Sequence, residues 1–391
     1  MNPSDQSPSG ARPRIDSLDW LRGLVMVVMA LDHTRDFFGS SGLDPRDVDE
    51  PLLFLTRWVT HFCAPVFVFL AGTSAYFYGR KRPADLPRFL WTRGLWLVVL
   101  EWTVVRIGWT FDVVPGFLPM QVIWAIGWSM VALALLVRLP VAWVGAFGLA
   151  VIFGHNALDG ITPEQLGELG WLWTLVHGFG PLAPIDSPLL PFAAYALIPW
   201  VGVIAAGFAF GPVMALPGKS RLHWLVGLGL GATASFLLLR ALGAYGDPVP
   251  WSVQPTALST VLSFLNCEKY PPSLLYLLMT LGPALLLLAA VDRTKRPLGR
   301  ALVTVGRVPL LYYVLHIYLI HAAAIVATTW AGGSLETLWD GFHPMFKAPS
   351  AGFDLTIVYT VWVGVVLALY PACRWFAAVK QRRSDWWLSY L

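Results

Sequence analysis

The stretch Arg14-Ile-Asp-Ser-Leu-Asp-Trp-Leu-Arg-Gly-Leu-Val-Met-Val-Val-Met-Ala-Leu-Asp-His-Thr-Arg-Asp-Phe-Phe38 reads as one helix that is apolar in the middle and charged near both ends. Its apolar centre predicts a position in lipid or in a packed helix bundle. Its last turns then bring Asp32, His33, Arg35 and Asp36 within five residues of one another. Ionisable side chains at membrane depth are costly and usually serve a function. We therefore expect the chemistry of this protein at the far end of this helix.

Composition places the whole chain among membrane proteins. Of its 391 residues, 57% are hydrophobic and 13% are charged, and the mean hydropathy is +0.62. A typical soluble domain carries about 25% charged residues. Repeated apolar runs of about 20 residues predict an all-α, polytopic bundle of membrane helices. The net charge of +4 comes from basic residues in short loops, which is the positive-inside pattern and no sign of nucleic-acid binding.

The two ends of the chain and its three cysteines offer no candidate catalytic or metal-binding residues. Residues 1–13 are polar and rich in Ser and Pro, so we expect a disordered cytoplasmic segment without a cleavable signal peptide. Residues 14–378 are expected to form one transmembrane domain, and residues 379–391 a basic cytoplasmic tail. The three cysteines have no CxxC pair and no metal-ligand spacing, so we expect packing roles, no disulfide scaffold and no metal.

Loop charges support a count of ten membrane spans. Basic loops and the basic tail fall on one side and acidic loops on the other, which predicts that both termini are cytoplasmic. The longer outer segments 157–189, 244–270 and 329–352 are expected to cap a cavity, and an eleventh short span near 256–266 is the alternative. The ten spans are 17–38, 52–79, 87–110, 117–138, 139–156, 190–212, 221–243, 271–291, 301–328 and 353–378.

Histidine is the best available base or nucleophile near neutral pH, because no phosphate-binding glycine loop, nucleophile elbow or HExxH motif is present. At 1.5 Å per residue, His33 should lie about 7 Å outward of the membrane midplane. His61 should reach a similar depth, with His316 near the centre of its span and His321 further out. These helices can offer imidazoles to one outer cavity. In the alternative interpretation, each histidine caps a neighbouring carbonyl or carboxylate.

Helical phase indicates which side of the first span faces the protein. Asp19, Arg22, Met26, His33 and Asp36 fall within about 100° of one another at 3.6 residues per turn. Asp19 and Arg22 lie at the cytoplasmic end, where the simplest interpretation is an ion pair that locks the helix.

The carboxylates near His33 are candidates for orienting its ring. Asp36 lies three residues after His33 and is the first candidate. Asp32 is the second, although it lies about 100° off that face. Arg35 should pair with Asp32 at the i,i+3 spacing.

Two later segments carry further candidates. Tyr312, Tyr313 and His316 share one face of the ninth span. Arg307 lies at the cytoplasmic boundary of that span, where it either snorkels to the membrane surface or meets a phosphate. Lys269 precedes the double proline before the eighth span, which is also consistent with a plain helix start.

Several motifs together resemble a known family. The opening stretch, with Met29-Ala-Leu-Asp-His33, is similar to the first helix of the heparan-alpha-glucosaminide N-acetyltransferase-like membrane proteins and of the bacterial acyltransferase-three type. The resemblance runs from about residue 14 to residue 378. The other matching motifs are Ala64-Pro-Val-Phe-Val-Phe-Leu-Ala-Gly-Thr-Ser74, Gln121-Val-Ile-Trp-Ala-Ile-Gly-Trp-Ser-Met130, Ile198-Pro-Trp-Val-Gly-Val203, Lys269-Tyr-Pro-Pro-Ser273 and Gly306-Arg-Val-Pro-Leu-Leu-Tyr-Tyr-Val-Leu-His316.

The resemblance implies transfer of an acyl group, most simply acetyl, from cytoplasmic acyl-CoA to an extracytoplasmic amino sugar or other glycan. In the acyltransferase-three pattern an Arg-Gly pair precedes a catalytic histidine by eleven residues, and Arg22 and His33 have this spacing. The lysosomal enzyme has its proposed catalytic histidine in the first lumenal loop, whereas residues 39–52 contain none.

Roles follow from these residues. We expect His33 to act as general base or as an acyl carrier, with Asp36 or Asp32 orienting it, and His61 or Tyr313 to polarise the thioester carbonyl. The residues assigned to acceptor binding are Arg35, Tyr313, His316, Lys269 and Trp124. The residues assigned to the phosphates of the donor are Arg22, Arg307 and the basic loop 80–82.

The predicted setting is the inner (cytoplasmic) membrane of a bacterium. The expected partners are the lipid bilayer, the acyl-CoA donor and the acceptor, with a homodimer left open and no nucleic acid. Two other classes of function remain as alternatives, a transporter with an Asp/His proton relay and a non-catalytic partner of a glycan-assembly system.

Overall fold

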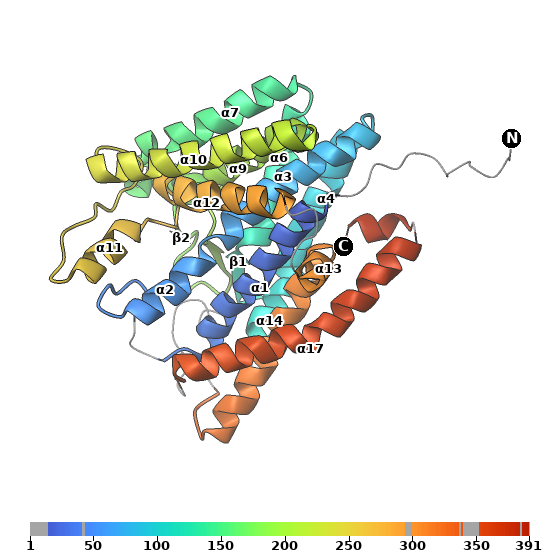
Figure 1. Cartoon of the computed structure of the whole chain (residues 1–391). Helices are drawn as coiled ribbons and strands as arrows, with labels where there is room; N and C mark the ends of the chain where they lie inside the picture. The colour runs from blue at the N-terminus through green and yellow to red at the C-terminus, as the bar shows by residue number, and fades with distance from the viewer. Residues whose placement is uncertain are drawn as a thin grey trace, which may run out of the picture.

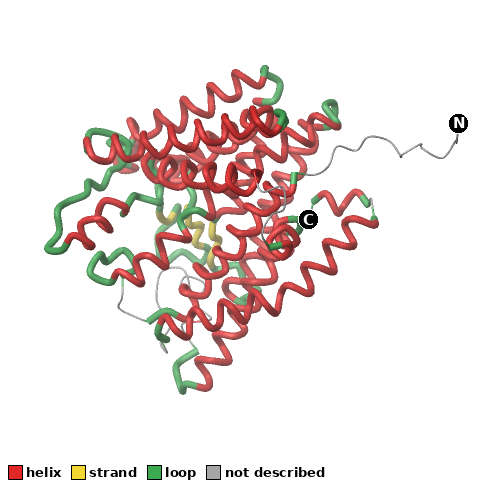
Figure 2. Tube along the Cα trace, in the orientation of Figure 1, coloured by secondary structure: helices red, strands yellow, loops and turns green. Residues whose placement is uncertain are grey.

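The computed structural model is a bundle of helices with a small sheet among them (Figures 1 and 2). It describes residues 15–40, 44–293, 299–335, 338, 352–383 and 385–390. The predicted disordered segment 1–13 lies outside the described residues.

The charged opening helix, α1 (Asp16–Phe38), crosses the middle of the bundle (Figure 1). It packs against α3 (Cys63–Lys81), α13 (Arg300–Gly306), α14 (Pro309–Trp330) and α17 (Leu355–Arg382). The last helix continues to Arg382, past the predicted domain boundary at 378. Because neighbours surround α1, its polar side chains can find partners inside the protein.

A second group of helices packs on the other side of α3. α3 lies along α9 (Leu197–Met214), and α9 in turn packs on α7 (Val141–Gly154). α10 (Gly218–Leu242) and α12 (Leu274–Arg293) form a further closely packed pair. Figure 1 shows α7 and α10 along the upper edge of the molecule.

Two predicted spans are interrupted in the structure. The span predicted at 52–79 divides into α2 (Pro51–Thr60) and α3 around His61. The next one consists of α4 (Leu86–Leu100), the π-helical turn η1 (Glu101–Val105) and α5 (Arg106–Thr110). Short π-helical stretches inside α-helices are frequent at functional sites.

The fold is mostly helical, as predicted, with one small three-stranded sheet in the order β1-β3-β2. β1 (Phe117–Met120) pairs in parallel with β3 (Leu190–Ala193), with Phe117 opposite Leu190. β2 (Gly180–Pro181) pairs antiparallel with β3. The membrane spans predicted at 117–138 and 190–212 included the residues of β1 and β3. β1 and β3 each contain a proline, Pro119 and Pro191, which lacks an N–H and would interrupt a helix. The helices that follow begin only after these strands, at Val122 and Leu197.

Short elements connect the spans in two of the outer segments predicted as caps. α11, in the region of the alternative eleventh span, has nine residues, fewer than the about 20 that a membrane span needs. The third such segment, 329–352, lies mostly outside the described residues. The short helices of these two segments are η3 (Pro163–Leu169), α8 (Gly170–His177) and α11 (Ala257–Leu265). Further short helices are α6 (Val122–Leu136), η2 (His155–Leu158) and η4 (Trp386–Ser389).

Length and composition support a multi-pass membrane bundle. Among the described residues, seven helical segments are long and apolar enough to cross a membrane, and α6 is a shorter apolar helix. In the most apolar windows of α10 and α17 only 22% and 17% of the residues are buried, which is typical of helices that face lipid. The count of ten spans and the side of the termini remain predictions. The seven segments are Pro51–Lys81, Val141–Leu158, Leu197–Met214, Gly218–Leu242, Leu274–Arg293, Pro309–Trp330 and Leu355–Arg382.

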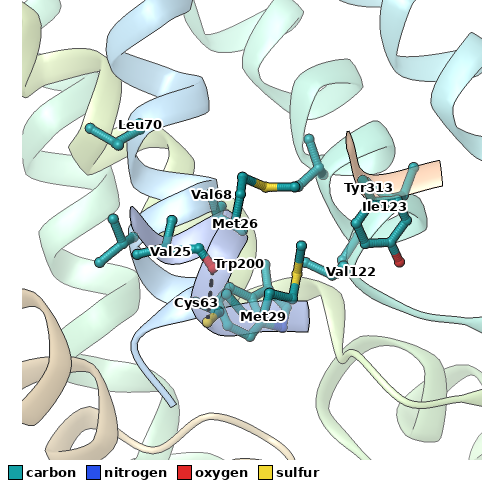
Figure 3. Close-up of a cluster of buried hydrophobic side chains, with 14 of the residues drawn as sticks. Val25, Met26, Met29, Cys63, Val68, Leu70, Val122, Ile123, Trp200 and Tyr313 are labelled. Atoms are coloured by element: carbon teal, nitrogen blue, oxygen red, sulfur yellow. Dashed lines mark hydrogen bonds between the residues drawn. The ribbon is translucent and has the colours of Figure 1, made fainter. Parts of the chain in front are cut away.

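The apolar half of α1 supplies the centre of the core (Figure 3). Val25 and Met26 of α1 are buried, and the thiol of Cys63 donates a hydrogen bond to the carbonyl oxygen of Val25 at 3.3 Å. All three cysteines are buried and free, in agreement with their predicted packing role.

Glycines allow the closest helix contacts. A Cβ atom placed on Gly72 of α3 would lie 2.1 Å from the carbonyl oxygen of Ile204 in α9. Thr73 donates a hydrogen bond to the carbonyl oxygen of Gly207 in the same contact, at 2.9 Å. Small residues of this kind let membrane helices approach closely and pack well.

We predict that Gly72→Val destabilises the bundle by about 1–3 kcal/mol, because a side chain there forces α3 and α9 apart. Thermal unfolding in detergent micelles measures the change. Gly227→Val is the control, since a Cβ atom on Gly227 of α10 would have no neighbour within 4 Å. Equal unfolding temperatures for the two variants would contradict this view of the contact.

Candidate functional site

The first feature of the candidate site is a direct contact between two imidazoles. Nδ1 of His33 on α1 lies 2.7 Å from Nε2 of His316 on α14. The rings are stacked, with centroids 4.8 Å apart and planes at 10°. His316 is fully buried and His33 retains 9% exposure. The sequence prediction that these helices offer histidines to one place is therefore confirmed for this pair.

Hydrogen bonding fixes the tautomers of the pair when both rings are neutral. Nδ1 of His316 lies 2.9 Å from the carbonyl oxygen of Tyr312, which can only accept, so His316 carries its proton on Nδ1. Its Nε2 then accepts a hydrogen bond from Nδ1–H of His33. His33 is left with an unprotonated Nε2, the nitrogen that a general base needs.

The other two predicted histidines lie elsewhere. The two ring nitrogens of His321 lie near backbone carbonyl oxygens, Nδ1 at 3.0 Å from Gly108 and Nε2 at 3.1 Å from Leu338. The interpretation that this histidine caps a neighbouring carbonyl therefore fits it. His61 is fully buried at the junction of α2 and α3, with its ring 5.4 Å from that of Tyr276. Neither ring nitrogen of His61 has a hydrogen-bond partner among the described residues.

Aromatic rings surround the histidine pair. The indole of Trp109 in α5 stands edge-on to His33 at 4.8 Å, and the ring of Tyr313 does so at 6.2 Å. Both aromatic side chains are buried. An environment of this kind excludes water and strengthens every electrostatic interaction within it.

Next to His33 along α1, charged groups form a network. Nη2 of Arg35 lies 2.8 Å from Oδ1 of Asp32, as the spacing predicts, and 2.8 Å from Oδ1 of Asp36. Asp32 also accepts a hydrogen bond from Thr60 at 2.8 Å and lies 3.5 Å from Nζ of Lys269.

The predicted contact between Asp36 and His33 is not formed. The Asp36 carboxylate instead pairs with the adjacent guanidinium of Arg35, which offers a full positive charge where a neutral imidazole offers none. Among the described contacts, the ring of His33 is oriented by His316 rather than by a carboxylate.

The network opens into a pocket with a volume of about 850 Å³. Asp32, Arg35 and Asp36 line it from α1, Arg57 from α2 and Lys269 from the loop before α12. A pocket with so many charged groups suits a polar ligand with several hydrogen-bonding groups.

Lys269 remains a cation in this pocket. Burial alone would lower its pKa, but the neighbouring Tyr270 and the Asp32 carboxylate outweigh burial and raise the pKa above its ordinary value. Its ammonium also lies 5.1 Å from the centre of the Tyr270 ring, within the range of a cation–π contact.

Arg22 and Arg307, predicted to bind the phosphates of the donor, meet at the opposite end of α1. The third predicted element, residues 80–82, lies at the end of α3. Nη1 of Arg22 bonds to Asp19 at 2.9 Å, and Nη2 to the hydroxyl of Ser74 at 2.8 Å. Arg307 pairs with Asp16 at 3.0 Å and lies 3.7 Å from Asp19. The two arginines thus share the Asp19 carboxylate, and the ion pair predicted between Asp19 and Arg22 is confirmed.

Two charged residues of the site region were missed by the sequence analysis. Arg57 lines the pocket, and Glu101 is fully buried in the π-helical turn, where its Oε2 accepts a hydrogen bond from the backbone N–H of Trp124 at 3.1 Å. Both lie inside predicted apolar spans. An ionisable side chain within an apolar span is costly and usually functional, so both residues could have been identified from the sequence by the argument used for the first helix.

The predicted acceptor residues are divided by the structure. Arg35 and Lys269 line the pocket, while Tyr313 and His316 lie beside His33. Trp124 is buried next to Glu101 and is not among the pocket residues.

Comparison with known families connects this geometry to an activity. The model of the family "Heparan-alpha-glucosaminide N-acetyltransferase, catalytic" matches residues 14–240, more than half of the chain and including His33, Arg22 and Arg57. No curated protein matches the chain. The chain therefore belongs to the heparan-alpha-glucosaminide N-acetyltransferase catalytic family and is a multi-pass membrane protein of the transmembrane acetyltransferase type.

Proposed function

We propose that this protein transfers an acyl group, acetyl in the simplest case, from cytoplasmic acyl-CoA to an extracytoplasmic amino sugar or other glycan across the inner (cytoplasmic) membrane. The contact of His33 with His316 carries the proposal, because it leaves an unprotonated ring nitrogen on α1 next to residues that line the charged pocket, with Arg22 at the opposite end of the same helix. The family membership supports the same class of reaction.

The chemical step begins with the acceptor in the pocket. Nε2 of His33 takes a proton from the acceptor amine or hydroxyl while the nitrogen or oxygen attacks the thioester carbonyl carbon. The carbon–sulfur bond then breaks, and His33 returns the proton to the departing thiolate of CoA. His316 holds the ring of His33 in place through the Nδ1–H bond.

The charge on His33 during this step needs stabilisation. Asp32 is the adjacent residue and lies in the network that borders the pocket, so its carboxylate favours the imidazolium. A second route, in which His33 itself takes the acyl group before the acceptor does, uses the same residues.

The donor phosphates are assigned to Arg22 and Arg307. Guanidinium groups match phosphate oxygens in geometry and charge. His33 lies about 16 Å further along α1, at 1.5 Å per residue. The flexible pantetheine arm of CoA would extend over this distance, with its thioester toward the histidine pair.

The outer pocket is assigned to the acceptor. Arg35 and Lys269 supply donors for hydroxyl or carbonyl oxygens, and Asp36 supplies an acceptor for an amine or hydroxyl proton. His61 and Tyr313 remain the candidates for polarising the thioester carbonyl.

Replacing His33 tests the proposed base. We expect His33→Ala to reduce acetyl transfer at least about 100-fold, since a general base contributes about 10²–10⁴. Proteoliposomes with acetyl-CoA on the cytoplasmic side and glucosamine on the other provide the assay. His223→Ala is the control, because His223 is exposed on α10 and far along the chain from the site. Full activity of the His33 variant would exclude this mechanism.

Replacing Arg307 tests the donor site. We expect Arg307→Gln to raise the KM for acetyl-CoA about tenfold or more with little change in kcat, because one charge-assisted hydrogen bond contributes about 1.5–3 kcal/mol. Arg300→Gln provides the control, as Arg300 is exposed at the start of the same helix, α13. An unchanged KM would place the phosphates elsewhere.

Binding of the donor separates an enzyme from a transporter or a non-catalytic partner. We expect acetyl-CoA at 100 times its Kd to stabilise the detergent-solubilised protein by about 2.7 kcal/mol, because the ligand binds the native state. A thermal shift assay measures the effect, with free adenine as the control. The absence of a shift with acetyl-CoA and longer acyl-CoAs would favour the alternatives.

A further inference from the structure

A second group of ionisable side chains lies outside the histidine pair and the pocket. His155 and Asp159 follow α7, and His177 ends α8. Their nitrogen and oxygen ligand atoms all lie within 4.8 Å of one another. Nε2 of His177 is 3.8 Å from Oδ1 of Asp159, and the two imidazole centroids are 5.7 Å apart. The chain brings these groups together by folding α8 back onto the end of α7.

The imidazole of His155 makes no hydrogen bond in this group. Its side chain is 98% buried, and neither ring nitrogen has a partner among the described residues. A buried polar group without a partner costs about 1–3 kcal/mol, so each case needs an explanation. A bound cation would supply the missing partner for one of these nitrogens.

The neighbours hold the group in a geometry suited to a cation. Nδ2 of Asn156 donates a hydrogen bond to Oδ2 of Asp159 at 2.8 Å, which leaves Oδ1 on the side of His177. Oδ1 of Asn156 in turn accepts from the backbone N–H of Leu274 at 2.8 Å. The indole of Trp173 stacks on His177 at 5.1 Å. Hydrogen bonds and apolar cover around ligands are typical of metal sites.

We propose that His155, Asp159 and His177 bind a divalent transition-metal ion of the zinc class. Two imidazoles and one carboxylate are a common ligand set for zinc, with a fourth position left for water or a carbonyl oxygen. A point equidistant from three atoms 4.8 Å apart lies about 2.8 Å from each. Zinc bonds are about 2.0–2.2 Å long, so each side chain moves by less than about 1 Å.

Metal binding requires one exchange of partners. Nε2 of His177 now lies 2.9 Å from the carbonyl oxygen of His155, and it would turn its lone pair to the metal with the ring proton on Nδ1. The freed carbonyl oxygen then lies next to the metal. Asp159 is 24% exposed in its side chain, which gives the ion a path from the surface.

The position of the site indicates its role. A metal ion there would tie the end of α7 to α8, and Asn156 connects the group to the first turn of α12. The loop before α12 carries Lys269 into the pocket. The metal would therefore stabilise the outer cap beside the pocket, whatever reaction the pocket supports. No metal was expected from the sequence, because it contains no CxxC pair and no HExxH motif, and this ligand set uses neither.

Zinc content of the purified full chain tests the proposal. The protein, without a polyhistidine tag, is stripped with chelator, dialysed against micromolar zinc and analysed by mass spectrometry. We expect about one zinc per chain in the wild type and in the control His223→Gln, and less than a tenth of that in His177→Gln and Asp159→Asn. No zinc in the wild type, or equal zinc in all variants, would overturn the site.

Two further measurements keep the test independent of folding defects. His155→Phe removes both unpartnered nitrogens while filling the same space, so we expect a folded, monodisperse protein that does not bind zinc. In the unaltered chain, cobalt should bind with the visible absorption of a tetrahedral site and should raise the unfolding temperature. Cobalt absorption typical of an octahedral, water-ligated ion, or no change in unfolding temperature, would contradict the proposal.

Discussion

The constraint on which the rest of this structure depends is the cost of burying ionisable groups in α1. Each such group must find a partner on another helix or in a neighbouring turn. His33 finds His316 on α14, Asp32 finds Lys269 before α12, and Arg22 finds Ser74 on α3. These contacts fix the position of α1 relative to three other parts of the bundle. The polar groups therefore organise the fold as well as the candidate site.

The same constraint gives α1 two polar ends. Arg22 and Arg307 gather around Asp19 at one end of α1. At the other end a charged pocket opens beside Asp32, and His33, the next residue, lies among aromatic rings. A donor and an acceptor approaching from opposite ends would meet at the histidine pair. Under this proposal, the charged groups whose burial in a membrane helix costs free energy are the groups that bind and activate the substrates.

The sequence predicted the local features and missed those that depend on distant contacts. Hydrophobic runs and helical periodicity were sufficient to predict most of the long helices. They also predicted the ion pair between Arg35 and Asp32, because these two residues lie one helical turn apart. Helical periodicity also led to Asp36 as the partner of His33, since phase cannot show that Arg35 competes for that carboxylate. The strands around Pro119 and Pro191 and the approach of His155 to His177 depend on pairing between segments far apart in the chain. Arg57 and Glu101, in contrast, were visible as charges within apolar spans.

The most direct measurement is a structure of the protein with bound acetyl-CoA in lipid nanodiscs. The account predicts phosphates in contact with Arg22 and Arg307 and a thioester at the histidine pair. Its carbonyl carbon should then lie close enough to Nε2 of His33 for an acceptor atom to fit between them, with reacting atoms about 3–3.5 Å apart. Phosphates bound elsewhere, or a thioester that does not reach His33 and His316, would contradict it.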